Sequence, residues 1–472
     1  MKAFTLTNRY RSGQGDLSTV SERCNAFMMG SYQAGREAVR QLEAVGRTDE
    51  RLHTYNRSPL LNRPGLLQAA DVAALEQDLS TLLELLTSLP DRLFDGDTAA
   101  MCERVGINGP ARQAVLDTID DYSVLLARAD VVRSVDGPKA IEFNIHSSLG
   151  GMDIGPLNET FLKLPVYGDF LRAESLTYHD PLDSILAEIL RAAADRGITG
   201  TPTVALVDWP TSYPIYEHVL ERVCALMRAR GIDAIHTHVG QLQERDKHLW
   251  SGKVRIDILY RIFMLEDIPE QPELIAPIVD VHRAGNVLLA MGFYAELVGN
   301  KASLALLSEP TNPDFLTAEE RATVDRILPR TRILREGRTT WAGEWCDVSD
   351  MAVARKNELI LKPAIGHGTL GVIPGWAVTE KEWRQALHDA DGDVFVLQER
   401  VAAAPEPIPT LENDEWTTRD YDVNWGVFIH QRRYAGAMLR ALPSSRPGVI
   451  SLGAGGAVGC CFHQEAPSDR SD

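Results

Sequence analysis

The chain has 472 residues, of which 44% are hydrophobic and 24% are charged, and its formal net charge is -18. This length exceeds one ordinary hydrophobic core, so we expect roughly two to four structural units that contain both α-helices and β-strands. The negative charge and the absence of a dense Lys/Arg run argue against nucleic acid or a membrane surface as a partner. An anionic ligand must then be held by a few placed cations.

The N-terminal residues give no sign of export. They lack an apolar signal segment, and no part of the sequence approaches the ~18 uninterrupted apolar residues of a membrane span. The cysteines are scattered without CxxC spacing, and the adjacent Cys460 and Cys461 are poorly placed to pair with each other. We therefore expect a cytoplasmic protein without a disulfide framework or a zinc site.

The first hundred residues are predicted to be mostly helical. Residues 66–95 repeat Leu, Val and Ala at helical spacing until Pro90 and the Asp95-Gly96 turn. The pattern then changes to short apolar runs at about 122–131 and 139–145. These runs predict two strands joined by a turn at Asp136-Gly-Pro138.

The middle of the chain alternates between the two kinds of element. An apolar run at 203–208 precedes an amphipathic helix at 216–230, and a further strand follows at 255–261. Such alternation is typical of an open α/β sheet. Residues 300–345 look helical and charged, and short strands dominate from Glu358 onward.

A Gly-rich loop follows Lys362, in the sequence Lys362-Pro-Ala-Ile-Gly-His-Gly-Thr-Leu-Gly371. A dinucleotide-binding loop should open a helix, but Pro374-Gly375 follows here, and a protein kinase places its lysine on a later strand. The order therefore favours a β-hairpin that covers phosphates, with a glycine-rich surface hairpin as the alternative. The nucleotide-contacting residues predicted in this loop are Gly366, His367, Gly368 and Gly371.

Polar residues follow a strand spacing near residue 130. Glu142 and Asn144 are two residues apart, as are Arg128 and Asp130, so each pair shares one face of its strand. Two carboxylates and an amide are the oxygen ligands that Mg²⁺ takes, and a fixed cation beside them can neutralise a transferring phosphoryl group. The alternative for each residue singly is a solvated strand face or a salt bridge.

Further candidates are unspecific when taken alone. Gln398 and Glu399 follow an apolar strand, where they could line an adenine pocket, with Glu399 accepting from a hydroxyl or amino group. Arg440 at a strand end could reach phosphate, although an exposed arginine is the simpler interpretation, and Lys301 is equally ambiguous. His146 and His367 lie close to the predicted site, but lone loop histidines usually face solvent.

Together these residues resemble a known family. Arg128-x-Asp130, Glu142-x-Asn144, Asn300-Lys301-Ala302, Lys362-Pro with its Gly-rich loop and Gln398-Glu399 resemble the synthetase domain of glutathionylspermidine synthase and its circularly permuted ATP-grasp relatives. The order matches as well, because the metal-binding residues precede the phosphate loop, whereas conventional ATP-grasp enzymes have the reverse order. The resemblance covers about residues 120–460, and His367 departs from it, since the family commonly has arginine there.

The resemblance implies a fold and a role for each matching residue. The implied fold class is α/β (α+β), a circularly permuted ATP-grasp fold. Mg²⁺ would be bound by Asp130, Glu142 and Asn144. Arg128 would stabilise an acyl phosphate, and Ser147 and Ser148 would lie where the carboxylate is activated. Lys301 and Lys362 would contact ATP phosphates, and Gln398 and Glu399 would line the adenine pocket.

The predicted units follow from the same comparison. They are a helical N-terminal segment (1–115), magnesium-binding strands (116–165), an open α/β subdomain of the pre-ATP-grasp kind (166–300), nucleotide-binding lobes with a Gly-rich lid (301–465) and a frayed tail (466–472).

The leading hypothesis is an ATP-dependent carboxylate-amine ligase that forms a peptide or gamma-glutamyl type amide bond between small molecules, at least one of them an amino acid. A carboxylate does not condense with an amine until one oxygen becomes a leaving group, and phosphorylation by ATP provides this. We expect ATP and Mg²⁺ as cofactors, and the oligomeric state, including a homo-oligomer, is left open. The alternatives are a small-molecule phosphotransferase and a nucleotide-binding protein without turnover.

Overall fold

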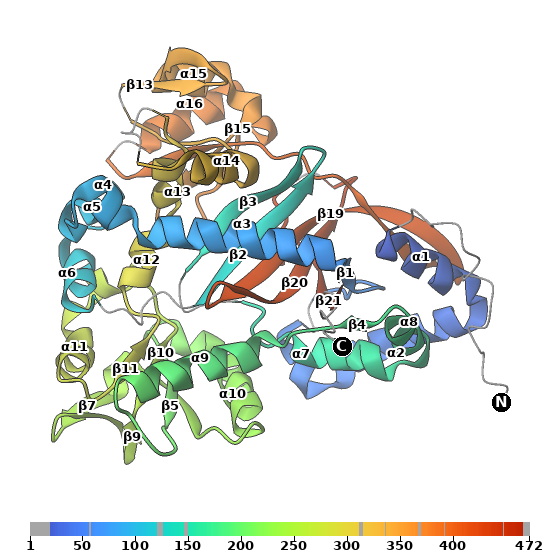
Figure 1. Cartoon of the computed structure of the whole chain (residues 1–472), viewed down its shortest axis with the longest axis horizontal. Coiled ribbons are helices and arrows are strands. Elements are labelled where there is room, and N and C mark those ends of the chain that lie inside the picture. The colour runs from blue at the N-terminus through green and yellow to red at the C-terminus, as the bar shows by residue number, and fades with distance from the viewer. Residues whose placement is uncertain are drawn as a thin grey trace, which may run out of the picture.

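The structure is a computed structural model that describes residues 19–55, 58–119, 126–145, 150–310, 315–335, 337–366, 370–390, 392–446 and 448–465. Within these ranges the chain has a mixed α/β fold with sixteen α-helices, which confirms the predicted fold class at this level. Figure 1 shows three parts: a large sheet in the middle, an α/β subdomain below it and a small lobe above it. None of the described helices is long and apolar enough to cross a membrane.

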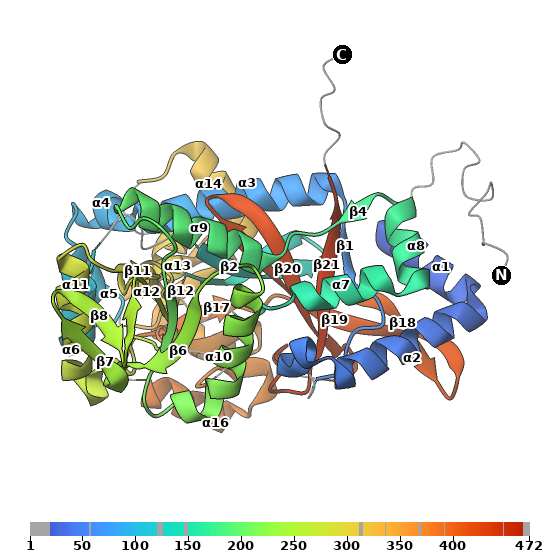
Figure 2. The same ribbon diagram turned by 90° about the horizontal axis from the view of Figure 1, so that it is seen from below.

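The N-terminal part is helical, and its longest helix is α3 (Ala69–Thr87). This helix packs on β19, β20 and β21 along one face of the large sheet (Figure 2). The helical pattern predicted at 66–95 forms two helices, because α3 ends at Thr87 and a second helix begins at Leu89. Pro90, in the first turn of that helix, has no N–H group with which to continue α3. The other helices here are α1 (Val20–Gly30), α2 (Tyr32–Thr48), η1 (Glu50–Tyr55), α4 (Leu89–Phe94), α5 (Thr98–Arg104) and α6 (Gly109–Asp117).

The large sheet joins strands from both ends of the chain. Its main order is β1-β21-β20-β19-β2-β3, with β18 paired to β19 and β4 paired to β21. The early strands β2 and β3 therefore form the edge beside the late strand β19. The strands are β1 (Gly65–Leu67), β2 (Leu126–Ser134), β3 (Gly137–Asn144), β4 (Leu176–Thr177), β18 (Glu406–Glu412), β19 (Glu415–His430), β20 (Arg433–Pro443) and β21 (Ala457–Gln464). Helices α7 (Gly155–Lys163) and α8 (Pro165–Ala173) connect β3 to β4.

The α/β subdomain contains a parallel sheet in the order β11-β10-β5-β6. Its strands are β5 (Val204–Asp208), β6 (Ala234–His238), β10 (Ile258–Arg261) and β11 (Leu288–Ala290), and its helices are α9 (Pro181–Asp195), α10 (Tyr213–Arg228) and α11 (Ala276–Arg283). The three-stranded sheet β7 (Leu242–Arg245), β8 (His248–Ser251) and β9 (Val254–Ile256) is attached to it. The strand predicted at 255–261 is divided, because the Asp257 carboxylate accepts the Thr203 N–H at 3.0 Å where the chain passes between the two sheets.

The small lobe has its own sheet, in the order β12-β17-β15-β16. Its strands are β12 (Thr331–Ile333), β15 (Leu359–Pro363), β16 (Ile373–Pro374) and β17 (Phe395–Glu399), with the hairpin β13 (Arg338–Trp341) and β14 (Glu344–Asp347). Its helices are α13 (Lys301–Ser308), α14 (Ala318–Ile327), α15 (Val348–Ala354) and α16 (Glu380–Asp389), which follow α12 (Tyr294–Val298). The prediction that 300–345 is helical holds only to α14, because β12 pairs with β17 from Thr331 onward.

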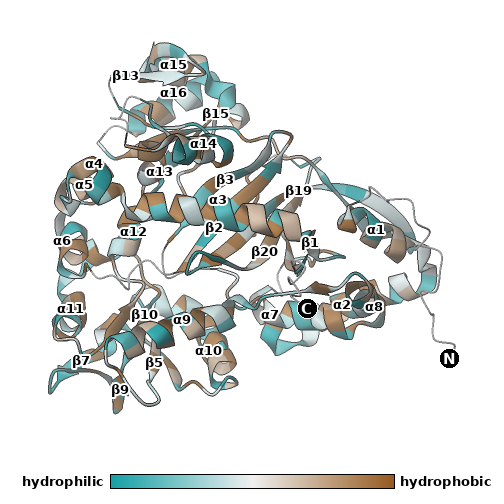
Figure 3. Cartoon of the chain, in the orientation of Figure 1, coloured by the Kyte–Doolittle hydropathy of each residue, from teal (hydrophilic) through white to brown (hydrophobic). Residues whose placement is uncertain are grey.

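Two hydrophobic cores hold these parts. One extends through the large sheet and the α/β subdomain, whose strands are hydrophobic in Figure 3. A separate cluster in the small lobe includes the fully buried rings of Trp341 and Trp383. The space between the small lobe and the large sheet is lined by both polar and apolar residues.

Candidate active site

Four polar residues lie on the face of β2 and β3 opposite α3. Arg128 and Asp130 share one face of β2, and the antiparallel register pairs Asp130 with Glu142 and Arg128 with Asn144. Arg133, which points to the other face of β2, is within 3.9 Å of Asp71 on α3. The structure thus brings together the residues predicted for the metal and for the acyl phosphate.

Asp130 lies between two arginines. Arg128 Nε donates to Oδ1 at 3.1 Å, and Arg440 Nη2, from β20, donates to Oδ2 at 2.5 Å. Burial alone would raise the pKa of Asp130, but Arg440 and Arg128 outweigh burial and lower it to about 2. Arg128 also donates to the Gly150 carbonyl at 2.6 Å, which fixes its orientation. The two arginines therefore favour the ionised form of Asp130.

Glu142 is paired with Lys301, the first residue of α13. The Nζ atom of Lys301 lies 3.1 Å from Glu142 Oε1 and donates to the Gly366 carbonyl at 2.7 Å. Burial favours the neutral acid, but the charge of Lys301 holds the pKa of Glu142 below its ordinary value. Lys301 thus connects β3 to the start of the Gly-rich loop. We call β2 and β3 the hook strands, because they carry the residues predicted to bind the metal.

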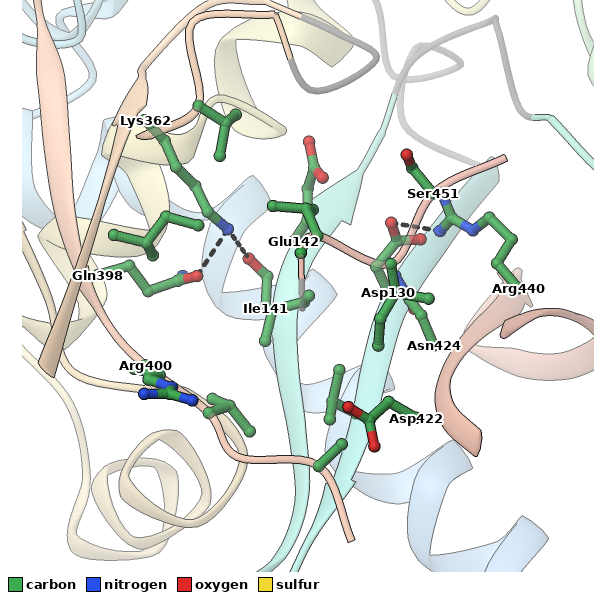
Figure 4. Close-up of a pocket in the computed structure, with 18 of the residues that line it drawn as sticks. Asp130, Ile141, Glu142, Lys362, Gln398, Arg400, Asp422, Asn424, Arg440 and Ser451 are labelled. Atoms are coloured by element: carbon green, nitrogen blue, oxygen red, sulfur yellow. Dashed lines mark hydrogen bonds and ion pairs between the residues drawn. The ribbon is translucent and has the colours of Figure 1, made fainter. Parts of the chain in front are cut away.

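Lys362 on β15 is buried without a carboxylate partner among the described residues. Its Nζ atom donates to Gln398 Oε1 at 2.7 Å and to the Ile141 carbonyl at 3.2 Å (Figure 4). Burial lowers the pKa of Lys362 to about 8, although the nearby charge of Glu142 acts in the opposite direction. A buried ammonium group without a counter-ion is costly, so an anionic ligand beside it would be favoured.

These side chains line one cavity of about 770 Å³ between the large sheet and the small lobe, which we call the candidate cavity. This is within the range of about 300–1,000 Å³ common for small-molecule sites. The charged groups nearest the hook strands are the cations Arg128, Lys301, Lys362 and Arg440 and the carboxylates Asp130 and Glu142. The four cations exceed the two carboxylates, which leaves a local positive excess in a chain of net charge -18. Such a site suits a polyphosphate bound with a divalent cation.

The Gly-rich loop is described only at its two ends. Gly366 and Gly371 have positive φ angles of 135° and 70°, which residues with a side chain rarely adopt. Gly366 and Leu370 line the candidate cavity, and the Leu370 side chain is 81% exposed. Five of the candidate residues lie outside the described residues: His146, Ser147, Ser148, His367 and Gly368.

Gln398 and Glu399 on β17 both line the cavity, but their side chains have protein partners. Gln398 accepts from Lys362, and its Nε2 lies 3.3 Å from Thr331 Oγ1. The Glu399 carboxylate is paired with Arg330, whose Nε donates to it at 3.1 Å. Glu399 therefore lines the cavity with its carboxylate paired to an arginine, and its acceptor role toward a ligand stays a prediction.

The sequence interpretation missed several lining residues. Arg400 lies with its guanidinium 4.4 Å from the centre of the Trp376 ring, and residues 444–446 and 448–451 line one side of the cavity. Asp422 and Asn424 line the wall formed by β19. Their spacing of two residues on a predicted strand was the available signal, but it does not reveal which sheet face they share with the metal-hook residues.

The oxygen ligands fit Mg²⁺ better than a transition metal. Asp130 and Glu142 supply hard carboxylate oxygens in directly paired positions, and Asn144 supplies an amide. No group of three or more His, Cys, Asp or Glu side chains that could hold a metal occurs in the described part of the chain.

Comparison with known proteins shows a shared fold. No protein-family profile and no curated protein sequence matches the chain. A glutathione synthetase-like effector from Globodera pallida superposes with a TM-score of 0.52 at 12% identity, over 87% of this chain and 90% of that one. A proposed gamma-glutamylcysteine synthetase from Methylobacillus flagellatus matches with a TM-score of 0.43 at 13% identity, over 82% and 88%. D-cycloserine synthetase gives a TM-score of 0.26 at 16% identity, over 57% and 93%. The chain has the fold of the first of these proteins.

Proposed function

We propose that this protein is an ATP-dependent carboxylate-amine ligase of the circularly permuted ATP-grasp type. The observation that carries the proposal is the candidate cavity, in which Asp130 and Glu142 lie among four cations contributed by β2, α13, β15 and β20. The fold shared with a glutathione synthetase-like protein supports the ligase class. The position of the hook strands, ahead of the Lys362 strand in the sequence, supports the permuted order.

The charged residues divide the proposed work between them. Lys362 and Lys301 would bind the phosphates of ATP, and Asp130, Glu142 and Asn144 would hold Mg²⁺, which neutralises phosphate charge when it is bound. Arg128 is oriented by Gly150 and faces the same space, where it would hold the transferring phosphoryl group. Arg440 donates to Asp130 Oδ2 and favours its ionised form, so it would have to share this carboxylate with Mg²⁺.

The proposed reaction has two balanced steps. A substrate carboxylate oxygen takes the terminal phosphoryl group of ATP, which gives an acyl phosphate and ADP. The unprotonated nitrogen of an amine then attacks the acyl carbon, phosphate leaves with the C–O bonding electrons, and the proton that the nitrogen loses as the amide forms goes to the released phosphate. The protein must exclude water between the two steps, and Gly366 and Leu370 of the Gly-rich sequence line the cavity where this exclusion would be needed.

The first experiment combines ADP release with trapping by hydroxylamine. The full chain is incubated with MgATP, hydroxylamine and a panel of carboxylic acids, and an activated acid is recognised by the mass of its hydroxamate. Glu142→Ala and Lys362→Ala should each abolish ADP release, whereas Lys381→Ala, which removes an exposed lysine of α16, should not. Undiminished turnover in both site variants would sink the site assignment.

The same assay distinguishes the two alternatives. A stable phosphate ester in place of a hydroxamate or an amide would identify a phosphotransferase. Nucleotide binding without ADP formation across the panel would identify a binding protein without turnover.

A further inference from the structure

Four carboxylates line the candidate cavity within the described residues, and one of them differs from the rest. Three are paired with arginine or lysine, namely Asp130, Glu142 and Glu399. The fourth, Asp422, forms no ion pair with any described residue, and its carboxylate accepts one hydrogen bond, from Ser444 Oγ at 2.6 Å. An ionised carboxylate has about four acceptor positions, so Asp422 keeps most of its capacity for a ligand.

Asn424 adds a second acceptor beside it. It follows Asp422 by two residues on β19, so both side chains lie on the same face of the sheet. Only 3% of Asn424 is exposed, and its Oδ1 atom has no hydrogen-bond partner. Buried amide oxygens are nearly always hydrogen-bonded, so an unpartnered one at a cavity wall indicates a missing donor. Figure 4 shows Asp422 and Asn424 across the cavity from Lys362 and Gln398, where phosphates are proposed to bind.

A free cation lies on the chain segment next to Asp422. Arg446 lines the cavity, is exposed and forms no ion pair or side-chain hydrogen bond with the described residues. Ser444 places Arg446 near Asp422. Its hydroxyl donates to the Asp422 carboxylate, and Arg446 follows it by two residues in the chain. Gly455 leaves room for the guanidinium, since a Cβ atom there would come within 3.2 Å of Arg446 Nη1.

We propose that the amine substrate is an amino acid, an inference that rests on the proposed function. Asp422 and Asn424 would hold its ammonium group, and Arg446 would hold its carboxylate. One acceptor group and one cation match the two charges of a zwitterion. A polyamine carries several ammonium groups, but the described lining has only one carboxylate without a cationic partner. The positive excess elsewhere in the cavity would repel the additional charges.

The test uses the full chain, MgATP and the acid that gives the strongest hydroxamate. The twenty standard amino acids are supplied as acceptors, each compared with its decarboxylated amine. Asp422→Asn should raise the KM for the best amino acid about tenfold or more, while the KM for ATP changes less than about twofold. Asp420→Asn, an exposed acid on the same strand outside the cavity lining, is the matched control and should change neither constant.

Arg446→Gln tests the other charge. It should remove the preference for the amino acid over its decarboxylated amine and leave the KM for that amine unchanged. The proposal is overturned if Asp422→Asn raises the KM for ATP instead, or if a triamine is used as efficiently as any amino acid. Absence of a hydroxamate with every acid refutes the ligase function itself, and this proposal with it, which separates the two failures.

Discussion

Two cavities border residues 399–402, and they differ in whether their charged side chains already have partners within the protein. The candidate cavity has about 770 Å³, and a second cavity of about 930 Å³ lies beside it, between α14, the turn of β2 and β3, and the small lobe. The second cavity is the larger and is rich in cations, including Lys139, Arg321 and Arg332. Size and positive charge alone would therefore favour the second cavity over the candidate cavity.

The cations of the second cavity already have partners in the protein. Lys139 donates to the carbonyls of Asp325 and Arg326 at 3.2 and 2.7 Å, near the end of α14. Arg332 donates from all three guanidinium nitrogens, to acceptors that include Thr339 Oγ1 at 2.8 Å. In the candidate cavity, by contrast, Asp422 forms no ion pair and Arg446 forms no ion pair or side-chain hydrogen bond with the described residues. Uncommitted polar groups distinguish a candidate site from a structural network.

The largest effect is expected from Arg332→Ala, which tests whether the cations of the second cavity stabilise the fold. Arg332 is 3.7 Å from Glu309, and both side chains are less than one-tenth exposed. Removal of one partner leaves a buried charge, so the free energy of unfolding should fall by about 3–5 kcal/mol. Urea unfolding measures it, with Arg321→Ala as a control that loses one bond to the Leu307 carbonyl. A loss below about 1 kcal/mol would contradict the structural assignment.

Arg440→Met tests whether a cation of the candidate cavity serves catalysis rather than stability. Loss of this cation removes a partner of Asp130 and should lower kcat by about 10²–10³-fold, the range seen when one electrostatic stabiliser is removed. The fold should persist, because Arg128 still pairs with Asp130. Steady-state kinetics and urea unfolding are measured together, with exposed Arg433→Met on the same strand as the control. A stability loss that accounts for all the lost activity would place Arg440 with the structural arginines.

The third expected effect is a dependence of nucleotide affinity on pH. In the free protein the pKa of Lys362 is about 8, below the ordinary value of 10.5, and bound phosphate would raise it. Binding then requires proton uptake above pH 8, so the affinity for MgATP should fall about tenfold per pH unit between pH 8.5 and 9.5 and stay flat below pH 7.5. Calorimetry in buffers of different ionisation enthalpy measures this uptake, which Lys362→Met should abolish. An affinity that rises with pH would show that Lys362 does not contact the phosphates.

Lys139→Ala should have the smallest effect. It loses two bonds to carbonyls at a helix end, so the free energy of unfolding should fall by about 1 kcal/mol or less. Turnover should stay within about twofold, measured by ADP release. A large loss of turnover at unchanged stability would show that the second cavity takes part in the reaction and would remove the distinction drawn above.

Sequence reasoning worked where the information is local. The spacing of two residues on a strand placed Glu142 and Asn144 on one face, and the Gly-rich sequence placed Gly366 beside the cavity. It failed where one residue redirects the chain, as at Asp257, which interrupts a predicted strand through a bond to Thr203. Neither pattern nor propensity encodes that contact, because its partner lies 54 residues away.

Contacts between residues far apart in the sequence also could not be predicted for the candidate site. The pairing of Glu399 with Arg330 and the position of Asp422 depend on how the small lobe and β19 meet the hook strands. That register is set by the packing of a large sheet rather than by local sequence. Arg440 was proposed as a phosphate contact, and its bond to Asp130 across 310 residues shows why its partner could not be predicted.

The early strand β2 pairs with β19, which is synthesised much later, and this delays folding of the large sheet during synthesis. Asp130 leaves the ribosome 310 residues before Arg440, which at about 5–20 residues per second is a delay of roughly 15–60 s. During that time β2 lacks β19, and its backbone groups form an open strand edge of the kind that other chains can pair with. Nascent chains of this protein should therefore depend on chaperones, and the pairing of β2 with β19 should be among the last parts of the large sheet to form.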